Sequence, residues 1–92
     1  MANQESTSIF RLRATGVVYE PGMMAPKILI HARGFRAQRM IEIAQQKGVP
    51  VVVNPDLSYA LSLVPEDFEI PEELYQVMAN LLIHLGKAGL DQ

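Results

Sequence analysis

The pattern of apolar and polar residues between positions 19 and 54 predicts a strand, a helix and a second strand. Residues 28–32 form a short, nearly continuous apolar run, which is typical of a strand buried on both faces. Apolar side chains then recur with the period of a helix, at Ala37, Met40, Ile41 and Ala44. Gly48 stands where a left-handed helix cap is expected, and residues 49–53 form a second apolar run. Two buried strands joined by one helix predict a parallel β-α-β unit.

The segment before this unit predicts one more strand and a turn. Residues 9–19 alternate partly between apolar and polar positions, as a half-exposed strand does, and Gly16 suggests a bulge or a close backbone approach. The following Pro-Gly pair breaks the strand. Met23 and Met24 come next and are apolar for a loop, which makes them candidates for contact with a partner.

Two further helices are predicted after the unit. Asn54 or Asp56 is expected to cap a short helix that continues to about residue 64, and Pro71 is expected to begin the last helix. Residues 66–70 between them form an acidic loop. We expect Phe68 and Ile70 in this loop to point inward.

These elements predict a small single-domain α/β fold. We expect a mixed sheet of three to four strands that contains the β-α-β unit and packs against about three helices. The domain is expected to span residues 9–88, between a disordered N-terminal tail at 1–8 and a short tail at 89–92. With 49% hydrophobic residues, the chain can build a core without metal or disulfide cross-links.

The composition excludes several classes of function. The chain has no cysteine, which excludes disulfides, thiolate catalysis and cysteine-based zinc sites. No apolar run approaches the ~18 residues that span a bilayer, and the N-terminus lacks the basic and then apolar pattern of a signal peptide. We therefore expect a soluble cytoplasmic protein.

The titratable residues do not form a catalytic pattern. His31 and His84 lack the paired spacing of metal ligands, so each is expected to be structural. Gly34 between two arginines allows an anion at a helix N-terminus, but a tight strand-to-helix turn is the preferred interpretation. The sequence predicts that the protein is not an enzyme and that it holds no cofactor and no metal.

Charge is divided unevenly between the two halves of the chain. Residues 1–50 carry seven basic and three acidic residues (+4), whereas residues 51–92 carry one basic and seven acidic residues (−6). Faces of opposite charge would favour oriented docking to a protein, although interleaved charges fit the sequence nearly as well. On charge and expected exposure, the candidate partner-binding residues are Met23, Met24, Arg33, Arg36, Arg39, Glu66, Asp67 and Glu69.

A small RNA-binding domain is the alternative function. It would use the basic face around Arg33, Arg36 and Arg39. Against this alternative, the sequence pI is about 5.6 and the few aromatic residues are expected in the core, which leaves no stacking platform. The sequence therefore favours a protein partner.

Several motifs occur in a characteristic order along residues 14–86. They are Tyr19, Ala25-Pro26, Ala32-Arg33-Gly34, Val49-Pro50, the leucine-containing stretch from Leu57 to Leu61, and Ile70-Pro-Glu-Glu-Leu-Tyr75. In this order and spacing the chain resembles the cytoplasmic C-terminal domain of the FlhB/YscU family. These are the export-switch proteins of flagellar and virulence type III secretion.

The resemblance also exposes two departures from full family members. Those proteins have an N-terminal membrane region, which this chain is not expected to have. They also cleave themselves at an Asn-Pro-Thr-His motif, whereas the corresponding residues 9–12 here read Ile-Phe-Arg-Leu. Asn54-Pro55 is not equivalent, because Asp-Leu follows it and a helix cap explains it. We therefore expect no self-cleavage, and no catalytic residue is carried over.

The resemblance implies a freestanding, non-cleaving homologue of the export-switch domain. Such a protein would substitute for the full-length switch protein or regulate it through protein–protein contacts. The implied partners are export-gate proteins, the hook-length ruler or export substrates. The implied location is the cytoplasm, peripheral to the export apparatus at the inner membrane.

Overall fold

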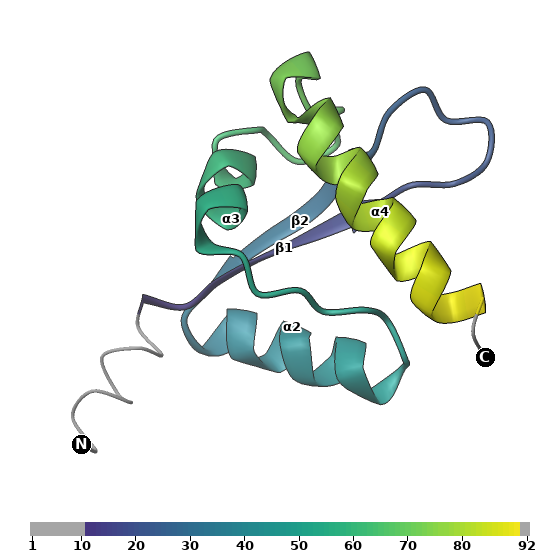
Figure 1. Cartoon of the computed structure of the whole chain (residues 1–92). Coiled ribbons are helices and arrows are strands. Elements are labelled where there is room, and N and C mark those ends of the chain that lie inside the picture. The colour runs from purple at the N-terminus through teal and green to yellow at the C-terminus, as the bar shows by residue number, and fades with distance from the viewer. Residues whose placement is uncertain (1–10, 91–92) are drawn as a thin grey trace.

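In the part of the chain that the structure describes, a β-hairpin is surrounded by three α-helices. The fold is given by a computed structural model that describes residues 11–90, with side chains up to residue 85. The elements are β1 (Arg13–Val18), β2 (Lys27–Arg33), α2 (Phe35–Gln46), α3 (Pro55–Ser62), the 3₁₀ helix η1 (Glu72–Leu74) and α4 (Tyr75–Leu90). Figure 1 shows the hairpin running diagonally, with α2 below it, α3 above it and α4 crossing its far end. The predicted tail at residues 1–8 lies outside the described residues, and α4 includes residues 89 and 90.

The hairpin is antiparallel and is irregular at Gly16. Its register runs from Arg13 opposite Arg33 to Val18 opposite Lys27, with a shift between Gly16 and Val17. A Cβ atom added to Gly16 would lie 3.2 Å from Cγ2 of Ile30, which is tighter than ordinary contact. The predicted bulge and close approach at Gly16 are both confirmed.

The acidic loop covers the outer edge of β2. The Ile28 backbone N–H donates to the Phe68 carbonyl (2.9 Å), and the Asp67 N–H donates to the Ile28 carbonyl (2.8 Å). The Ile70 N–H donates to the Pro26 carbonyl (3.0 Å), and the Ile70 side chain is buried, as predicted. The prediction for Phe68 is wrong, because its side chain is 61% exposed. Asp67 has a positive φ of 71° and turns the chain, so only Ile70 reaches the core.

The hydrophobic core lies between β2, α3, α4 and this loop. Its buried members are Ile28, Leu57, Leu61, Ile70 and Met78. Half-buried Val17, Val64, Leu74 and Leu81 pack around them. Burying apolar side chains of this size contributes about 1.5–3 kcal/mol each to folding, so this cluster holds the hairpin and the two helices together.

The turns into and out of the first two helices follow the predicted chemistry. Gly48 has a φ of 75° just after α2, as a left-handed cap requires. The Asn54 side-chain oxygen accepts a hydrogen bond from the Leu57 backbone N–H (3.1 Å), and Pro55 occupies the first turn of α3. Both predicted caps are therefore confirmed.

Residues 49–53 do not form the predicted second strand of a β-α-β unit. Within residues 11–90 the sheet has two strands, and both belong to the antiparallel hairpin. The segment is irregular, and its four valine side chains are exposed, with Val53 at 90%. The α/β class and the three helices are confirmed, whereas the mixed sheet of three to four strands is not. An apolar run indicates surface that favours burial, but it does not indicate what covers that surface.

Candidate functional site

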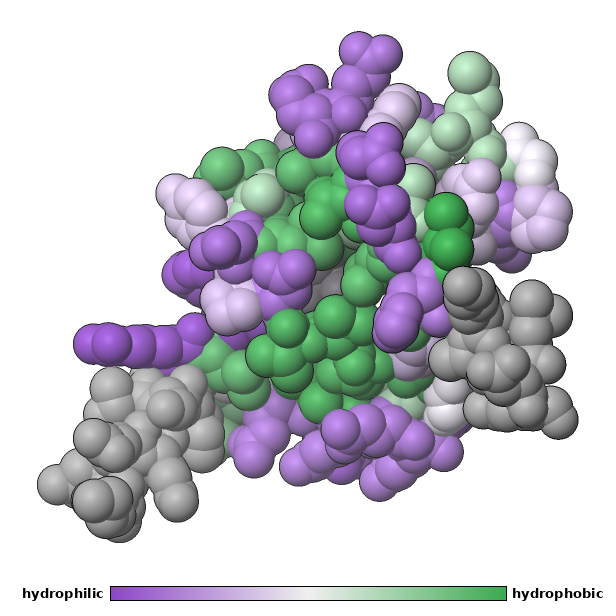
Figure 2. All heavy atoms as spheres, viewed as in Figure 1, coloured by the Kyte–Doolittle hydropathy of each residue, from purple (hydrophilic) through white to green (hydrophobic). Residues whose placement is uncertain are grey.

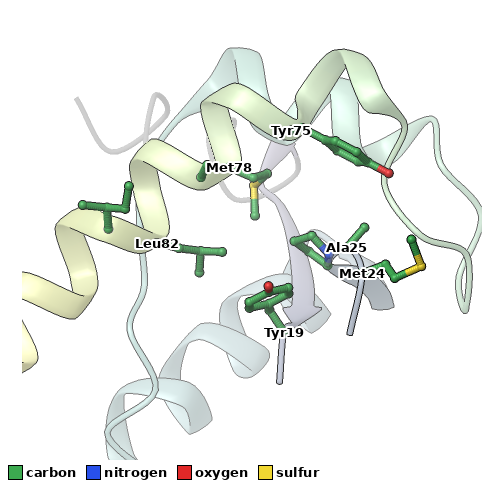
Figure 3. A pocket seen from close by; sticks show the side chains of 9 residues that line it. Tyr19, Met24, Ala25, Tyr75, Met78 and Leu82 are labelled. Atoms are coloured by element: carbon green, nitrogen blue, oxygen red, sulfur yellow. The ribbon is translucent and has the colours of Figure 1, made fainter. Parts of the chain in front are cut away.

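An open apolar groove lies between the loop joining β1 to β2 and the first half of α4 (Figure 3). Its volume is about 290 Å³. The loop side contributes Tyr19, Met24, Ala25 and Pro26, and α4 contributes Tyr75, Met78, Ala79, Leu82 and Ile83. Figure 3 shows Met78 and Leu82 pointing from α4 toward Tyr19 and Ala25.

The loop side of the groove combines a fixed floor with an exposed rim. The Met23 backbone N–H donates to the Glu20 carbonyl (3.0 Å), which closes the turn around Gly22. Ala25 is buried, and so is Pro26, whose carbonyl also holds the acidic loop. Met24 is 93% exposed, so its flexible side chain is available to a partner.

The α4 side of the groove is one face of the helix. Tyr75, Met78, Ala79, Leu82 and Ile83 follow the i, i+3, i+4, i+7, i+8 spacing of a single helical face. Met78 is buried and shared with the core, whereas Ile83 is 64% exposed. None of these residues is among the contact residues predicted from the sequence. The sequence did contain a signal for them. The apolar residues of this helix are too numerous for one face, which indicates a second apolar surface.

The chemistry of the groove suits apolar side chains. Its lining has no carboxylate, histidine, lysine or arginine. Exposed carboxylates stand nearby in the sequence, at Glu20 beside Tyr19 and at Glu72 and Glu73 in η1 just before Tyr75. The groove can therefore bury apolar groups of another protein, and its lining offers no nucleophile, general base or metal ligand.

The predicted contact residues fall into three separate places. Met24 lines the groove, whereas Met23 is half-buried and its sulfur accepts a hydrogen bond from the Glu20 backbone N–H (3.3 Å). The basic residues Arg33, Arg36 and Arg39 lie away from the groove, and the acidic residues Glu66, Asp67 and Glu69 lie on the loop that covers β2.

The arginines gather at the end of the hairpin where α2 begins. Arg33 lies opposite Arg13 in the register, and Arg36 and Arg39 follow in the first turns of α2. All three predicted arginines are exposed. Arg39 forms an ion pair with Glu42 (3.6 Å) that is open to solvent on both sides and therefore contributes little to stability.

Part of the acidic loop serves the fold. A carboxylate oxygen of Glu66 accepts a hydrogen bond from the His31 backbone N–H (2.9 Å), and Asp67 and Glu69 are exposed. The His31 ring lies between the Val64 carbonyl, 2.6 Å from Nε2, and the Thr15 hydroxyl, 2.9 Å from Nδ1. His31 therefore has the structural role that the sequence predicted for it.

Neither a metal-site cluster nor a membrane-spanning helix is found among the described residues. Among the described residues, no cluster of three or more His, Asp or Glu side chains has the arrangement of a metal site. Within the same part of the chain, no helix has both the length and the apolar character needed to cross a membrane.

Comparisons with known proteins agree with the motif order. Residues 13–85 match the model of the "FlhB HrpN YscU SpaS Family". The PscU C-terminal domain is 31% identical, with a TM-score of 0.75 over 79% of this chain and 95% of that one. The SpaS C-terminal domain has the same fold, with a TM-score of 0.79 and 23% identity over 87% of this chain and 94% of that one. A search of curated proteins gave no match.

Proposed function

Because the chain belongs to the FlhB HrpN YscU SpaS family, we propose that it acts as a non-cleaving export-switch domain in type III secretion. Membership of this family supports a role as an export-switch domain of type III secretion. Within that role, the chain would substitute for the full-length switch protein or regulate it. No comparison points to nucleic acid, so the RNA-binding alternative has no support.

The non-cleaving part of the proposal rests on the sequence. Where family members carry the self-cleaving Asn-Pro-Thr-His motif, residues 9–12 carry no asparagine, proline or histidine. Asparagine cyclisation needs the asparagine side chain, and no residue at these positions replaces it. The switch would therefore act through binding alone.

The binding part of the proposal rests on the apolar groove. We propose that it docks an apolar segment of an export-gate protein, the hook-length ruler or an export substrate. Met24 and Ile83 form an exposed rim over the buried floor of Met78, so a partner side chain can insert between them. Each apolar side chain that becomes buried contributes about 1.5–3 kcal/mol, or roughly tenfold or more in affinity.

The test replaces the rim with charge and measures binding to purified export-gate cytoplasmic domains and export substrates. Ile83→Glu should weaken binding of the partner at least tenfold, because the carboxylate would be buried against apolar groups. Leu63→Glu is the matched control, because Leu63 is similarly exposed (68%) and does not line the groove. Equal affinity of the two variants would refute the groove as the docking site.

The arginines provide a second, electrostatic contribution in this proposal. Complementary charge raises the association rate more than it raises final affinity. Replacing Arg33, Arg36 and Arg39 with glutamate should therefore slow association and reduce its dependence on salt, provided that circular dichroism shows an intact fold. Unchanged association would remove this patch from the proposal. Asp67 and Glu69 are the remaining candidates on the acidic loop.

A further inference from the structure

One outer edge of the hairpin is paired with another segment, and the other is not. The outer edge of β2 is paired with the acidic loop, including a β-bridge between Lys27 and Glu69. Among the described residues, nothing pairs with the outer edge of β1: the sheet ends there, and no backbone hydrogen bond reaches it from another segment. An open edge of this kind presents unpaired N–H and C=O groups to any extended chain that approaches.

A second segment, residues 49–53, lies on the same side of the molecule, and most of its backbone lacks hydrogen-bond partners among the described residues. Residues 49–53 connect α2 to α3, and both helices contact β1. Figure 1 shows the segment between α2 and β1. Within the described part of the chain, Val49 donates to the Ala44 carbonyl (2.8 Å), and residues 50–53 make no backbone hydrogen bond.

The side chains here are apolar and open to solvent. Val49, Val51, Val52 and Val53 are all exposed. Figure 2 shows apolar residues gathered across the middle of this face, over the region where Figure 1 places the 49–53 segment. Exposed valines beside unpaired backbone suit a β-strand from elsewhere, which would satisfy the hydrogen bonds and cover the side chains together.

The distribution of charge around β1 and residues 49–53 indicates the composition of the strand that would bind there. Residues 14–18 of β1 and residues 48–55 carry no charge. At the end where β1 begins, Arg13 lies opposite Arg33, and Arg36 and Arg39 follow in α2. The complementary ligand is therefore uncharged along its length and acidic at one end. Residues 1–8 of this chain do not fit, since they read Met-Ala-Asn-Gln-Glu-Ser-Thr-Ser, with one acidic residue in the middle and no valine or isoleucine to cover the exposed valines.

We propose that the free edge of β1 and the 49–53 segment form a receptor for an added strand from another protein. The strand is extended, rich in β-branched apolar residues, and carries carboxylates at the end that meets the arginines. It pairs with β1 and covers the valines of residues 49–53. This surface is distinct from the groove on α4 and does not rest on the proposed function.

The first experiment uses the synthetic peptide Asp-Glu-Val-Thr-Val-Ile-Val-Thr, blocked at both ends, with the full chain. Nuclear magnetic resonance titration and amide hydrogen exchange report where it binds. We expect saturable binding with a Kd below about 1 mM, together with slower exchange at residues 14–18 and 51–53. No binding at that concentration, or protection located at the α4 groove instead, would overturn the proposal.

Two control peptides test the two parts of the proposal, which are backbone hydrogen bonding to β1 and the acidic end of the strand. The same sequence with alternate amides N-methylated keeps the side chains but loses strand hydrogen bonds, and should bind at least tenfold more weakly. A version with two lysines in place of the acidic pair should bind several-fold more weakly at low salt. Equal affinity of the N-methylated peptide would overturn strand addition, and equal affinity of the lysine version would overturn the acidic end.

Two protein variants locate the site. Val52→Lys should weaken peptide binding at least fivefold, whereas Leu63→Lys, an exposed apolar residue elsewhere, should not. Protein variants would also reveal whether this surface is instead covered by a second copy of the chain or by the chain's own N-terminal segment. A dimer that dissociates on Val52→Lys would identify a second copy as the ligand, and deletion of residues 1–10 that accelerates exchange at 51–53 would identify the N-terminal segment. Either result would overturn the proposal.

Discussion

Truncation of Ile70 to alanine tests whether the acidic loop is anchored in the core. Ile70 is 2% exposed and packs in the cluster that contains Ile28 and Met78. Removing most of a buried isoleucine side chain costs about 2–5 kcal/mol, because apolar burial is lost and a cavity remains. A domain of this size has a total stability of about 5–15 kcal/mol. The variant should fold, with a melting temperature lowered by roughly 10–30 °C.

Ile83→Ala is the matched control for this measurement. It makes the same chemical change at a side chain that is 64% exposed, so the free energy of unfolding should change by less than about 0.5 kcal/mol. Urea unfolding followed by circular dichroism gives both values, provided that the slope with denaturant is unchanged. In the Ile70 variant, amide exchange should also accelerate at Ile28 and Asp67, whose hydrogen bonds join the loop to β2.

Two outcomes would refute this reasoning. A loss below about 1 kcal/mol for Ile70→Ala would mean that the side chain is not held in a filled core. Equal losses for the two variants would mean that burial does not distinguish the two positions. Ile70→Val should fall between the extremes, at about 0.5–1.5 kcal/mol.

Three further predictions concern local features of the chain. Asn54→Ala should lower the free energy of unfolding by about 1 kcal/mol through loss of the α3 cap, whereas Asn54→Asp should not; equal thermal stability of the alanine variant would contradict the cap. Gly48→Ala should cost about 1 kcal/mol from its φ of 75° alone, since an added Cβ meets no atom within 4 Å, and Gly48→Asn should cost less in the same assay. Purified protein kept at neutral pH should retain a single intact mass, and two fragments split near residues 9–12 would show self-cleavage.

The features that the sequence predicted well are local ones. Asn54, Gly48 and Gly16 each act through the backbone of their own few residues, by a cap, a positive φ or a close approach. Such effects depend on residue type and spacing, both of which are visible in the sequence. The helical period of α2 and α3 likewise arises from positions within one turn of each other.

The features that the sequence did not predict depend on what lies beside an apolar residue. Residues 49–53 have the composition of a buried strand, yet their valines face solvent. Phe68 and Ile70 are similar in hydrophobicity, but the turn at Asp67 leaves only Ile70 inside. Composition shows that a surface favours burial, and only tertiary structure shows whether this chain covers it.

The candidate site was predicted only in part for the same reason. Met24 was selected because it is apolar in a loop, and it lines the groove. Its neighbours across the groove, such as Ala79 and Leu82, were not selected, because helical spacing alone does not separate a face that packs in the core from one that stays open. The arginines were selected by charge, and the register of the hairpin with the start of α2 brings them to one end.

The most direct test of the account is a secretion assay. The C-terminal switch domain is deleted from the full-length export protein, and secreted substrates are quantified with this chain supplied in wild-type form, as Ile83→Glu or as Leu63→Glu. We predict that the wild type and Leu63→Glu restore or alter secretion to the same extent, and that Ile83→Glu does so at least tenfold less. If all three proteins are folded and abundant and give the same secretion, the apolar groove is not the surface through which the chain acts. If secretion with the wild-type chain equals secretion with no chain supplied, the chain has no role in export in this assay.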